Sequence, residues 1–270
     1  MLIDVKSMVE EIKAEEKAKG LKRELLILQV GDNPASNVYV NGKRKDCESI
    51  GYGCTVVKVD GSRPGYQLEK VVNYSDADGI ILQEPCGLSD EWRRRILRKI
   101  RRWQDVDGFL PDSDHTPCTP LGIMNIIERF CGSKDLSGKI VAVIGRGELV
   151  GKPMMKLLIE NGATAISCNS RTPNLAKVAG QADIIISATG QKGLITKSHL
   201  KKGAIVIDAG IFVDENGKLH GDCDRVLYDD PDVWVTPVPG GVGLMTRMAL
   251  MQNLGNAHGS HRYEDSEIEF

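Results

Sequence analysis

The feature that most constrains the fold is a regular alternation of short apolar runs with helical patterns. The apolar runs lie at 24–30, 54–60, 78–84, 141–145, 164–169, 183–190, 204–210 and 233–238. Each is short enough to be a strand, and turn residues bound several of them. Strands that alternate with helices are typical of parallel sheets. The sequence therefore predicts an α/β protein.

Several segments between the strands show helical periodicity. They lie at 1–20, 37–50, 68–74, 121–130 and 243–254. Ser36 is a candidate N-cap for the second of these helices, and Gly51 a candidate stop. We also expect a helix over 90–103, since Trp92, Ile96, Ile100 and Trp103 recur at helical spacing. Its other side is strongly basic, which favours a packed stripe beneath a solvated face over attraction of a polyanion.

The chain is long enough for two domains. The proline-rich segment 111–120 separates the first set of strands from the second. We predict a first domain over 1–119 and a second over 120–242. A C-terminal helix at about 243–270 is expected to return to the first domain.

Composition excludes several classes of protein. A net charge of −2 gives no general attraction to nucleic acid or to anionic lipid. The first residues lack the pattern of a signal peptide, and no apolar run is long enough to span a membrane. The 7 cysteines are scattered without a C-x-x-C pair, so no metal site is expected. Reduced thiols in a cytoplasm are the expectation.

A glycine turn follows the strand at 141–145. Gly145, Gly147 and Gly151 are spaced G-x-G-x-x-x-G between this strand and a predicted helix. The N-terminus of a helix binds phosphate through its free N–H groups and its dipole. The spacing differs from the usual dinucleotide fingerprint, so an ordinary tight turn stays an alternative.

The end of the next strand bears on the kind of nucleotide. NAD sites carry an acidic residue there, to hold the ribose 2′-hydroxyl. This chain has Ser170 and Arg171 instead, with Arg146 in the glycine turn. Arginine binds phosphate through two parallel hydrogen bonds, which favours NADP. Small residues at 187–190 and 208–210 follow later strands, where a dinucleotide lies in such sheets.

Polar residues also follow the strands of the first domain. Tyr39 and Lys43 share a helix face after the first strand, Gln83 ends the third, and Asp107 lies in a turn. A single lysine is most often a solvated cation. The alternative is that Lys43 is a positioned proton carrier.

With these residues in view, the chain resembles the bifunctional 5,10-methylenetetrahydrofolate dehydrogenase/cyclohydrolase family. The resemblance covers about residues 24–254 and rests on ordered blocks. These are VGDNPASNVYVNGKRK, GIILQEP, DVDGF, PCTPLGI, VIGRGELVGKPM, ADIIISATG, VIDAGI and TPVPGGVGLMT. It implies a folate domain and a Rossmann-like domain with an active-site cleft between them. The implied reactions are NADP-dependent oxidation of 5,10-methylenetetrahydrofolate and hydrolysis of the product to 10-formyltetrahydrofolate, in one-carbon metabolism and purine biosynthesis.

The resemblance also implies residue roles. Lys43 would be the catalytic group, Gln83 would hold it, Tyr39 would stack on the folate, and Asp107 would bind the pterin. Pro239 and Gly240 would contact substrate. Residues that would bind the cofactor are Gly145, Arg146, Gly147, Val150, Gly151, Ser170, Arg171, Thr189, Gly190 and Ile211.

The resemblance to the family also implies a homodimer that forms through the second domain. The sequence departs from the family pattern at Glu84, Gly147 and Leu244. Two alternatives therefore stay open: a dehydrogenase that has lost or weakened the cyclohydrolase step, and a non-catalytic NADP-binding homologue.

Overall fold

The computed structural model describes residues 1–60 and 64–257, which form two compact units. The three-stranded unit comprises Lys13–Thr116 and the chain from Leu250 onward. The five-stranded unit comprises Met1–Ile12 and Pro117–Ala249. Helix α1 (Val5–Ala18) and helix α8 (Val242–Asn256) each contribute residues to both units. Residues 258–270 of the C-terminal helix expected from the sequence lie outside the described residues.

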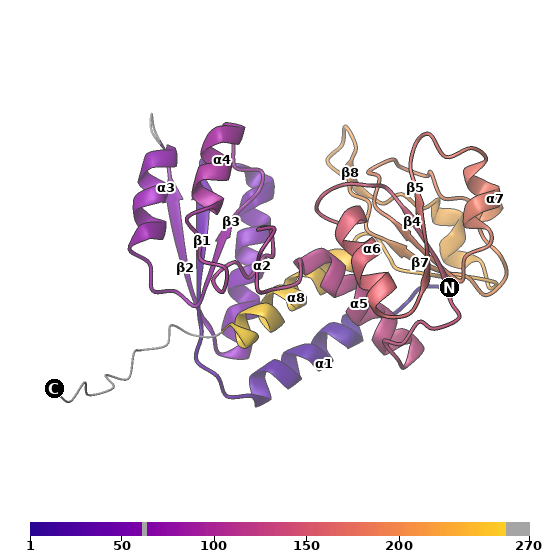
Figure 1. Ribbon diagram of the computed structural model, residues 1–270, viewed down its shortest axis with the longest axis horizontal. Coiled ribbons are helices and arrows are strands. Elements are labelled where there is room, and N and C mark those ends of the chain that lie inside the picture. The colour runs from indigo at the N-terminus through magenta and orange to yellow at the C-terminus, as the bar shows by residue number, and fades with distance from the viewer. Residues whose placement is uncertain (61–63, 258–270) are drawn as a thin grey trace. The chain divides into compact units, whose positions relative to one another are not determined.

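The three-stranded unit is a parallel sheet with the order β2-β1-β3 (Figure 1). Its strands are β1 (Glu24–Val30), β2 (Gly53–Val59) and β3 (Gly79–Leu82), and its helices are α2 (Pro34–Ile50), α3 (Pro64–Asn73) and α4 (Asp90–Leu97). Because the strands are parallel, their carboxyl ends share one edge of the sheet. Polar residues that follow these strands are therefore gathered at that edge.

One face of this sheet packs against α3 and α4. Leu26, Leu28 and Ile80 point to that face, where Leu68 of α3 and Ile96 of α4 cover them. Helices α3 and α4 lie side by side (Figure 1). The intervening residues Leu25 and Ile27 point to the opposite face, because side chains alternate along a strand. They are fully buried too, so both faces of the central strand are covered.

Helix α2 begins earlier than the sequence predicted. It starts at Pro34, so Ser36 is inside the helix and is not its N-cap. Proline is favoured in a first turn because its missing N–H has no partner there anyway. The Asn33 side chain accepts from the backbone N–H of Ser36 at 3.3 Å, which is the contact of a capping residue. The predicted stop is confirmed: the helix ends at Ile50, and Gly51 has φ +98°.

Helix α4 is shorter than predicted. Ser89 caps its start, and it ends at Leu97 instead of Trp103. Beyond that point, Lys99 donates to the carbonyl of Ile96 and Ile100 to that of Leu97, each bond reaching back three residues. Arginines recur at spacings of three and four around this end, and like charges at those spacings disfavour a longer helix. The apolar stripe persists, since Ile96 and Ile100 are both buried.

The five-stranded unit is a parallel sheet with the order β10-β7-β6-β4-β5. Its strands are β4 (Ile140–Ile144), β5 (Thr164–Cys168), β6 (Ile184–Ser187), β7 (Ile205–Asp208) and β10 (Trp234–Val235). Its helices are α5 (Cys118–Cys131), α6 (Gly151–Glu160) and α7 (Leu175–Ala179), with short 3₁₀ turns at Lys197–His199 and Arg225–Asp229. A small antiparallel hairpin pairs β8 (Phe212–Val213) with β9 (Leu219–His220), which the sequence did not indicate.

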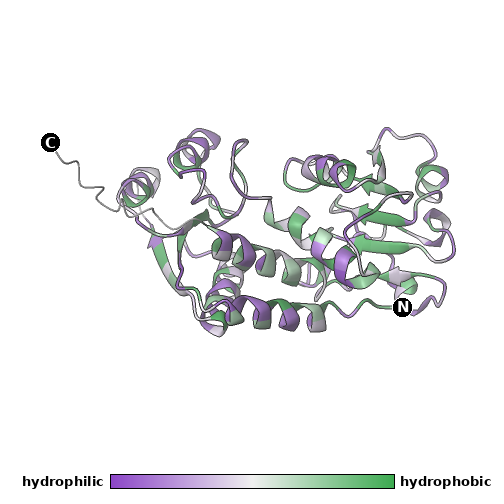
Figure 2. Cartoon of the chain, turned by 60° about the horizontal axis from the view of Figure 1, so that its bottom comes forward, coloured by the Kyte–Doolittle hydropathy of each residue, from purple (hydrophilic) through white to green (hydrophobic). Residues whose placement is uncertain are grey.

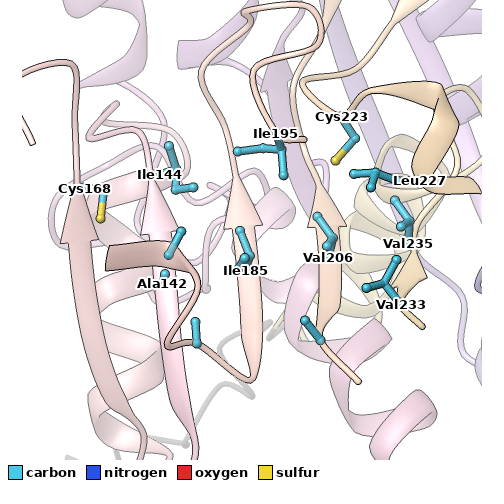
Figure 3. Close-up of a cluster of buried hydrophobic side chains, with 13 residues drawn as sticks. Ala142, Ile144, Cys168, Ile185, Ile195, Val206, Cys223, Leu227, Val233 and Val235 are labelled. Carbon is cyan, nitrogen blue, oxygen red and sulfur yellow. The ribbon is translucent and has the colours of Figure 1, made fainter. Parts of the chain in front are cut away.

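Apolar strand residues form the core of this unit. Ala142, Ile144, Ile185 and Val206 from neighbouring strands gather on one face (Figure 3). Figure 2 shows the strands of this unit as hydrophobic and parts of the helix surfaces as hydrophilic. Strands covered on both faces explain why the sequence has continuous apolar runs here instead of alternation. Within the described part of the chain, no helix is both long and apolar enough to cross a membrane.

The first residues belong to the five-stranded unit, although the sequence analysis assigned 1–119 to one domain. Ile3 donates its N–H to the carbonyl of Val235, and Val235 donates to the carbonyl of Met1, both at 2.9 Å. These bonds attach the chain start to strand β10. A strand pairing over 232 residues of separation has no local signature in the sequence.

Candidate functional site

Lys43 is joined to Gln83 in the three-stranded unit. Its ammonium nitrogen Nζ donates to Gln83 Oε1 at 3.0 Å. Lys43 lies on α2, which follows β1, and Gln83 directly follows β3. The two side chains therefore meet because β1 and β3 are adjacent parallel strands. Lys43 is half-buried, whereas the following Arg44 and Lys45 are exposed.

Gln83 is fixed at three points. Its backbone N–H donates to the carbonyl of Leu28 at 2.8 Å, which extends the β1–β3 pairing by one residue. Its side-chain Nε2 donates to the carbonyl of Glu84 at 2.6 Å. Because Nε2 is engaged in this way, Oε1 is directed to the lysine. The side chain is 6% exposed, so this orientation is maintained with little access of water.

Tyr39 lies one helical turn before Lys43 and is 39% exposed. Ser36, a further turn back on the helix, is buried, and its hydroxyl donates to the carbonyl of Pro85 at 3.4 Å. Helix α2 and the loop after β3 are thus connected at both Ser36 and Lys43. An exposed aromatic ring beside a fixed lysine suits the binding of a flat ligand.

Asp107 is half-buried in a turn that ends at Gly108, which has φ +73°. The preceding Val106 lies against Gly79, where a Cβ would meet its methyl carbon at 2.7 Å. Gly79 begins β3, and Gln83 follows its end. Asp107 therefore follows a segment packed at the amino end of β3, while Gln83 lies past its carboxyl end.

Glu84 is paired with a cation of α4. Its Oε1 accepts from Arg93 Nε at 2.5 Å, and its Oε2 accepts from the N–H of Cys86 at 3.0 Å. Arg95 and Lys99 pair with Glu69 at 2.9 and 3.9 Å. Carboxylates of the protein itself thus neutralise part of the basic face, which supports its interpretation as a packed and solvated surface.

The glycine turn of the five-stranded unit brings backbone segments unusually close. Gly145 has φ +111°, and a Cβ there would meet the carbonyl oxygen of Ala188 at 2.4 Å. A Cβ on Gly151 would meet the carbonyl oxygen of Gly145 at 2.2 Å. At Gly147 nothing lies within 4 Å. The first and last glycines shape the turn, and the middle one faces open space. Val150 is the N-cap residue of α6 and makes no side-chain capping bond.

The loops after β6 and β7 lie next to this turn. Ile144 at the end of β4 is paired with Ser187 at the end of β6, so Thr189 and Gly190 follow beside Gly145. Ile211 after β7 is close as well, since a Cβ on Gly190 would meet its carbonyl at 3.5 Å. Three predicted cofactor segments thus converge at the point where the strand order reverses, which is where open α/β sheets bind ligands.

Two buried carboxylates that the sequence analysis missed hold these loops. Asp222 accepts from the Ser187 hydroxyl at 2.6 Å and from the N–H groups of Thr189 and Gln191 at 2.7 and 2.9 Å. Asp208 accepts three backbone N–H groups, those of Gly210, Asp222 and Cys223. Burial raises the pKa of the Asp208 carboxyl in spite of these donors.

The sequence contains one indication of these two carboxylates, namely a glycine packed against each of them. A Cβ on Gly210 would meet Asp222 at 2.0 Å, and one on Gly221 would meet Asp208 at 2.1 Å. Each aspartate thus lies where the opposite loop carries a glycine. The pairing becomes visible only when the two loops are known to be neighbours.

The predicted 2′-phosphate residues lie at the end of β5. Arg146 crosses from the glycine turn and donates to the hydroxyl and the carbonyl of Ser167, each at 3.0 Å. Ser170 and Arg171 follow β5 and are exposed. Pro239 and Gly240 lie between β10 and α8. Pro239 is exposed after a cis peptide bond, and Gly240 has φ +102°.

Comparisons with known proteins agree with this arrangement. Residues 3–107 match the catalytic domain of tetrahydrofolate dehydrogenase/cyclohydrolase, and residues 117–262 match its NAD(P)-binding domain. The bifunctional protein FolD of Streptococcus uberis is 36% identical over 272 residues, covering 93% of this chain and 95% of the relative.

Solved structures give the same result. The bifunctional FolD enzyme of Campylobacter jejuni superposes with a TM-score of 0.84 at 36% identity, covering 95% of this chain and 98% of that one. The Trypanosoma brucei enzyme, solved with NADP and an inhibitor, gives 0.83 at 30% identity, with coverages of 94% and 95%. Nothing in the comparisons favours a dehydrogenase without cyclohydrolase activity or a non-catalytic homologue. The chain belongs to the tetrahydrofolate dehydrogenase/cyclohydrolase family and is an enzyme of folate one-carbon metabolism with both activities.

Proposed function

We propose that Lys43 is the proton carrier of the hydrolytic step and that Gln83 positions it. The observation that carries this proposal is the 3.0 Å hydrogen bond between Lys43 Nζ and Gln83 Oε1. A surface lysine has no such buried partner and samples many rotamers. An amide oxygen that accepts one N–H of the lysine fixes the direction of the lysine side chain and adds no charge to the site.

The substrate of the first reaction is 5,10-methylenetetrahydrofolate. NADP supplies the hydride acceptor when it is bound. The residues present fit such a cofactor, because Gly145 and Gly151 allow a tight turn between β4 and α6 and Gly147 faces open space. The positive dipole end of α6 would face the pyrophosphate, although Lys152 already donates its N–H to the Gly147 carbonyl and Pro153 has none. Arg171, Ser170 and Arg146 would hold the 2′-phosphate, and the loops at Thr189, Gly190 and Ile211 would flank the remainder.

In the second reaction water attacks the methenyl carbon of the oxidised substrate. Lys43 in its neutral form takes one proton from this water. The bond between that carbon and N5 then breaks as Lys43 delivers this proton to N5. The hydroxyl group loses its remaining proton to solvent, which leaves the formyl group on N10. General acid–base catalysis of this kind suits a lysine that can alternate between two charge states.

Asp107 and Tyr39 would hold the folate. A carboxylate accepts two parallel N–H bonds from the aminopyrimidinone edge of a pterin. The Tyr39 ring would stack on the ligand, and Pro239 and Gly240 would add contacts.

We further propose that residues 1–119 and the C-terminal helix serve folate binding, although Met1–Ile12 pack within the five-stranded unit. Residues 120–242 would bind NADP, and a homodimer would form through them. Phe212 and Val213 are consecutive and 39% and 58% exposed, as expected of an apolar contact surface. The cysteines are all free thiols, which supports a reducing cytoplasm. Formation of 10-formyltetrahydrofolate would serve purine biosynthesis.

A paired spectrophotometric assay tests the residue assignments. Methenyltetrahydrofolate absorbance is followed while it forms with NADP or NAD, and separately while purified methenyltetrahydrofolate is hydrolysed. We expect both steps in the parent protein, with NADP preferred. Loss of hydrolysis alone in the Lys43→Met variant supports the assignment. Equal rates in the parent and this variant would refute it.

A further inference from the structure

Glu84 places a negative charge directly beside the residue that holds the proposed catalytic lysine. It follows Gln83 in the chain, and its own backbone carbonyl accepts the Gln83 Nε2 at 2.6 Å. A lysine ammonium is attracted to a carboxylate by opposite charge as well as by a hydrogen bond, whereas a neutral amide offers the hydrogen bond without the charge. A free Glu84 carboxylate would therefore compete with Gln83 for Lys43.

The structure removes that competition by engaging both carboxylate oxygens. Arg93 Nε donates to Oε1 at 2.5 Å, and the N–H of Cys86 donates to Oε2 at 3.0 Å. The Glu84 and Arg93 side chains are 36% and 32% exposed, so the ion pair is partly shielded from water. Arg93 lies on α4, whose start is fixed by the Ser89 cap.

The loop from Gln83 to Cys86 is connected to three elements. Gln83 continues the pairing of β3 with β1, Pro85 accepts from Ser36 of α2, and Glu84 is held by Arg93 of α4. Of these three contacts, the one with Arg93 joins two charged side chains. Neighbouring cations are used differently, since Arg95 stacks on the Trp92 ring and pairs with Glu69.

We propose that Arg93 is a positioning residue for hydrolysis, acting through Glu84. Its guanidinium keeps the Glu84 carboxylate away from the Lys43 ammonium and so leaves Gln83 as the partner of that ammonium. This inference rests on the proposed role of Lys43. It assigns a task to one member of a basic helix that otherwise serves packing and solvation.

The test compares Arg93→Met, Glu84→Gln, the double variant and Lys43→Met in both assays, with melting temperatures measured for each. Arg93→Met leaves an unpaired carboxylate, so kcat for hydrolysis should fall about tenfold. The KM for methylenetetrahydrofolate and the kcat of the dehydrogenase should change less than about threefold, since groups outside the coupled network respond independently. Arg94→Met is the matched control, because Arg94 is an exposed neighbour on the same helix.

Rescue separates positioning from simple loss of structure. Glu84→Gln removes the competing charge, so the double variant should regain hydrolysis to within about threefold of the parent. A merely structural pair would not be restored by removing its second member. If Arg93→Met hydrolyses at the parent rate while Lys43→Met does not, this inference is wrong and the role of Lys43 stands. If Lys43→Met also hydrolyses at the parent rate, both the inference on Arg93 and the proposed role of Lys43 are wrong. An inactive double variant that melts like the parent also overturns the inference.

Discussion

The two units prepare their sites in different ways. In the three-stranded unit the proposed chemistry rests on side chains that other side chains hold: Lys43 is bound by Gln83, and the neighbouring Glu84 by Arg93. In the five-stranded unit the proposed cofactor site is built mainly from backbone. Glycines allow close approach at Gly145 and Gly151, and buried aspartates gather N–H groups from the loops.

This difference decides how each unit should respond to substitution. A side chain that carries chemistry can be removed while the fold stays intact, so activity falls more than stability. A backbone turn cannot be altered without moving its neighbours, so stability and binding fall together. The following predictions test that contrast, beginning with the largest expected effect.

Lys43→Met should lower methenyltetrahydrofolate hydrolysis by about 10²–10⁴-fold, the usual worth of a general acid–base group. Oxidation should remain measurable, because hydride transfer needs no proton taken from carbon by the protein. Lys45→Met, which alters an exposed lysine of the same helix, is the control. If a folded Lys43 variant hydrolyses at the parent rate, this side chain does not carry the hydrolytic chemistry of the three-stranded unit.

Gly145→Ala should lower the free energy of unfolding by about 2–4 kcal/mol and weaken NADP binding with it. The new Cβ meets a carbonyl at 2.4 Å, and φ +111° is strained for any L-residue. Gly147→Ala, where nothing lies within 4 Å, should change stability little. Chemical denaturation and NADP titration measure both quantities. Equal effects at the two glycines would show that close backbone approach is not what the turn requires.

Asp222→Asn should cost about 1–3 kcal/mol of stability, since an amide NH₂ would face at least one of the three donors that surround the carboxylate. Asp224→Asn is the control, because Asp224 caps a turn by accepting from Val226 and asparagine caps equally well. Thermal unfolding of both variants gives the comparison. If Asp222→Asn unfolds at the same temperature as the parent, the buried carboxylates do not stabilise this unit.

In the five-stranded unit, Arg171→Ala should weaken binding without lowering stability, unlike the substitutions in the glycine turn. Its side chain is exposed, so the fold should be unaffected. Loss of one charge-assisted contact should weaken NADP by about tenfold and leave NAD almost unchanged. Lys177→Ala removes another exposed cation of the unit and should affect neither. Equal weakening of both nucleotides would argue against a 2′-phosphate contact at this position.

Much of the fold was predictable from the sequence because the strands are continuous apolar runs. The predicted runs at 24–30 and 141–145 became β1 and β4 with nearly the same bounds. The helix predicted over 90–103 was too long. Apolar spacing continues through Ile100, while the hydrogen bonds have already changed to shorter-range ones. A hydrophobic pattern reports which face is buried, and not where backbone geometry changes.

The candidate site was predictable only in part. Resemblance to the family indicated Lys43 and Gln83, and the structure joins them by a hydrogen bond. The partnership of Glu84 with Arg93 and the cluster of Asp208 and Asp222 were not indicated. Both depend on which loops become neighbours, and that is set by strand order, which single residues do not reveal.

The attachment of α8 has a consequence for synthesis on the ribosome. Asn253 donates to the carbonyls of Val106 and Thr116, which precede it by 147 and 137 residues. These two carbonyl groups remain without this donor until α8 has emerged from the ribosome. The three-stranded unit is therefore completed after the five-stranded unit, although most of it is made first, and until then it exposes the surface that α8 later covers.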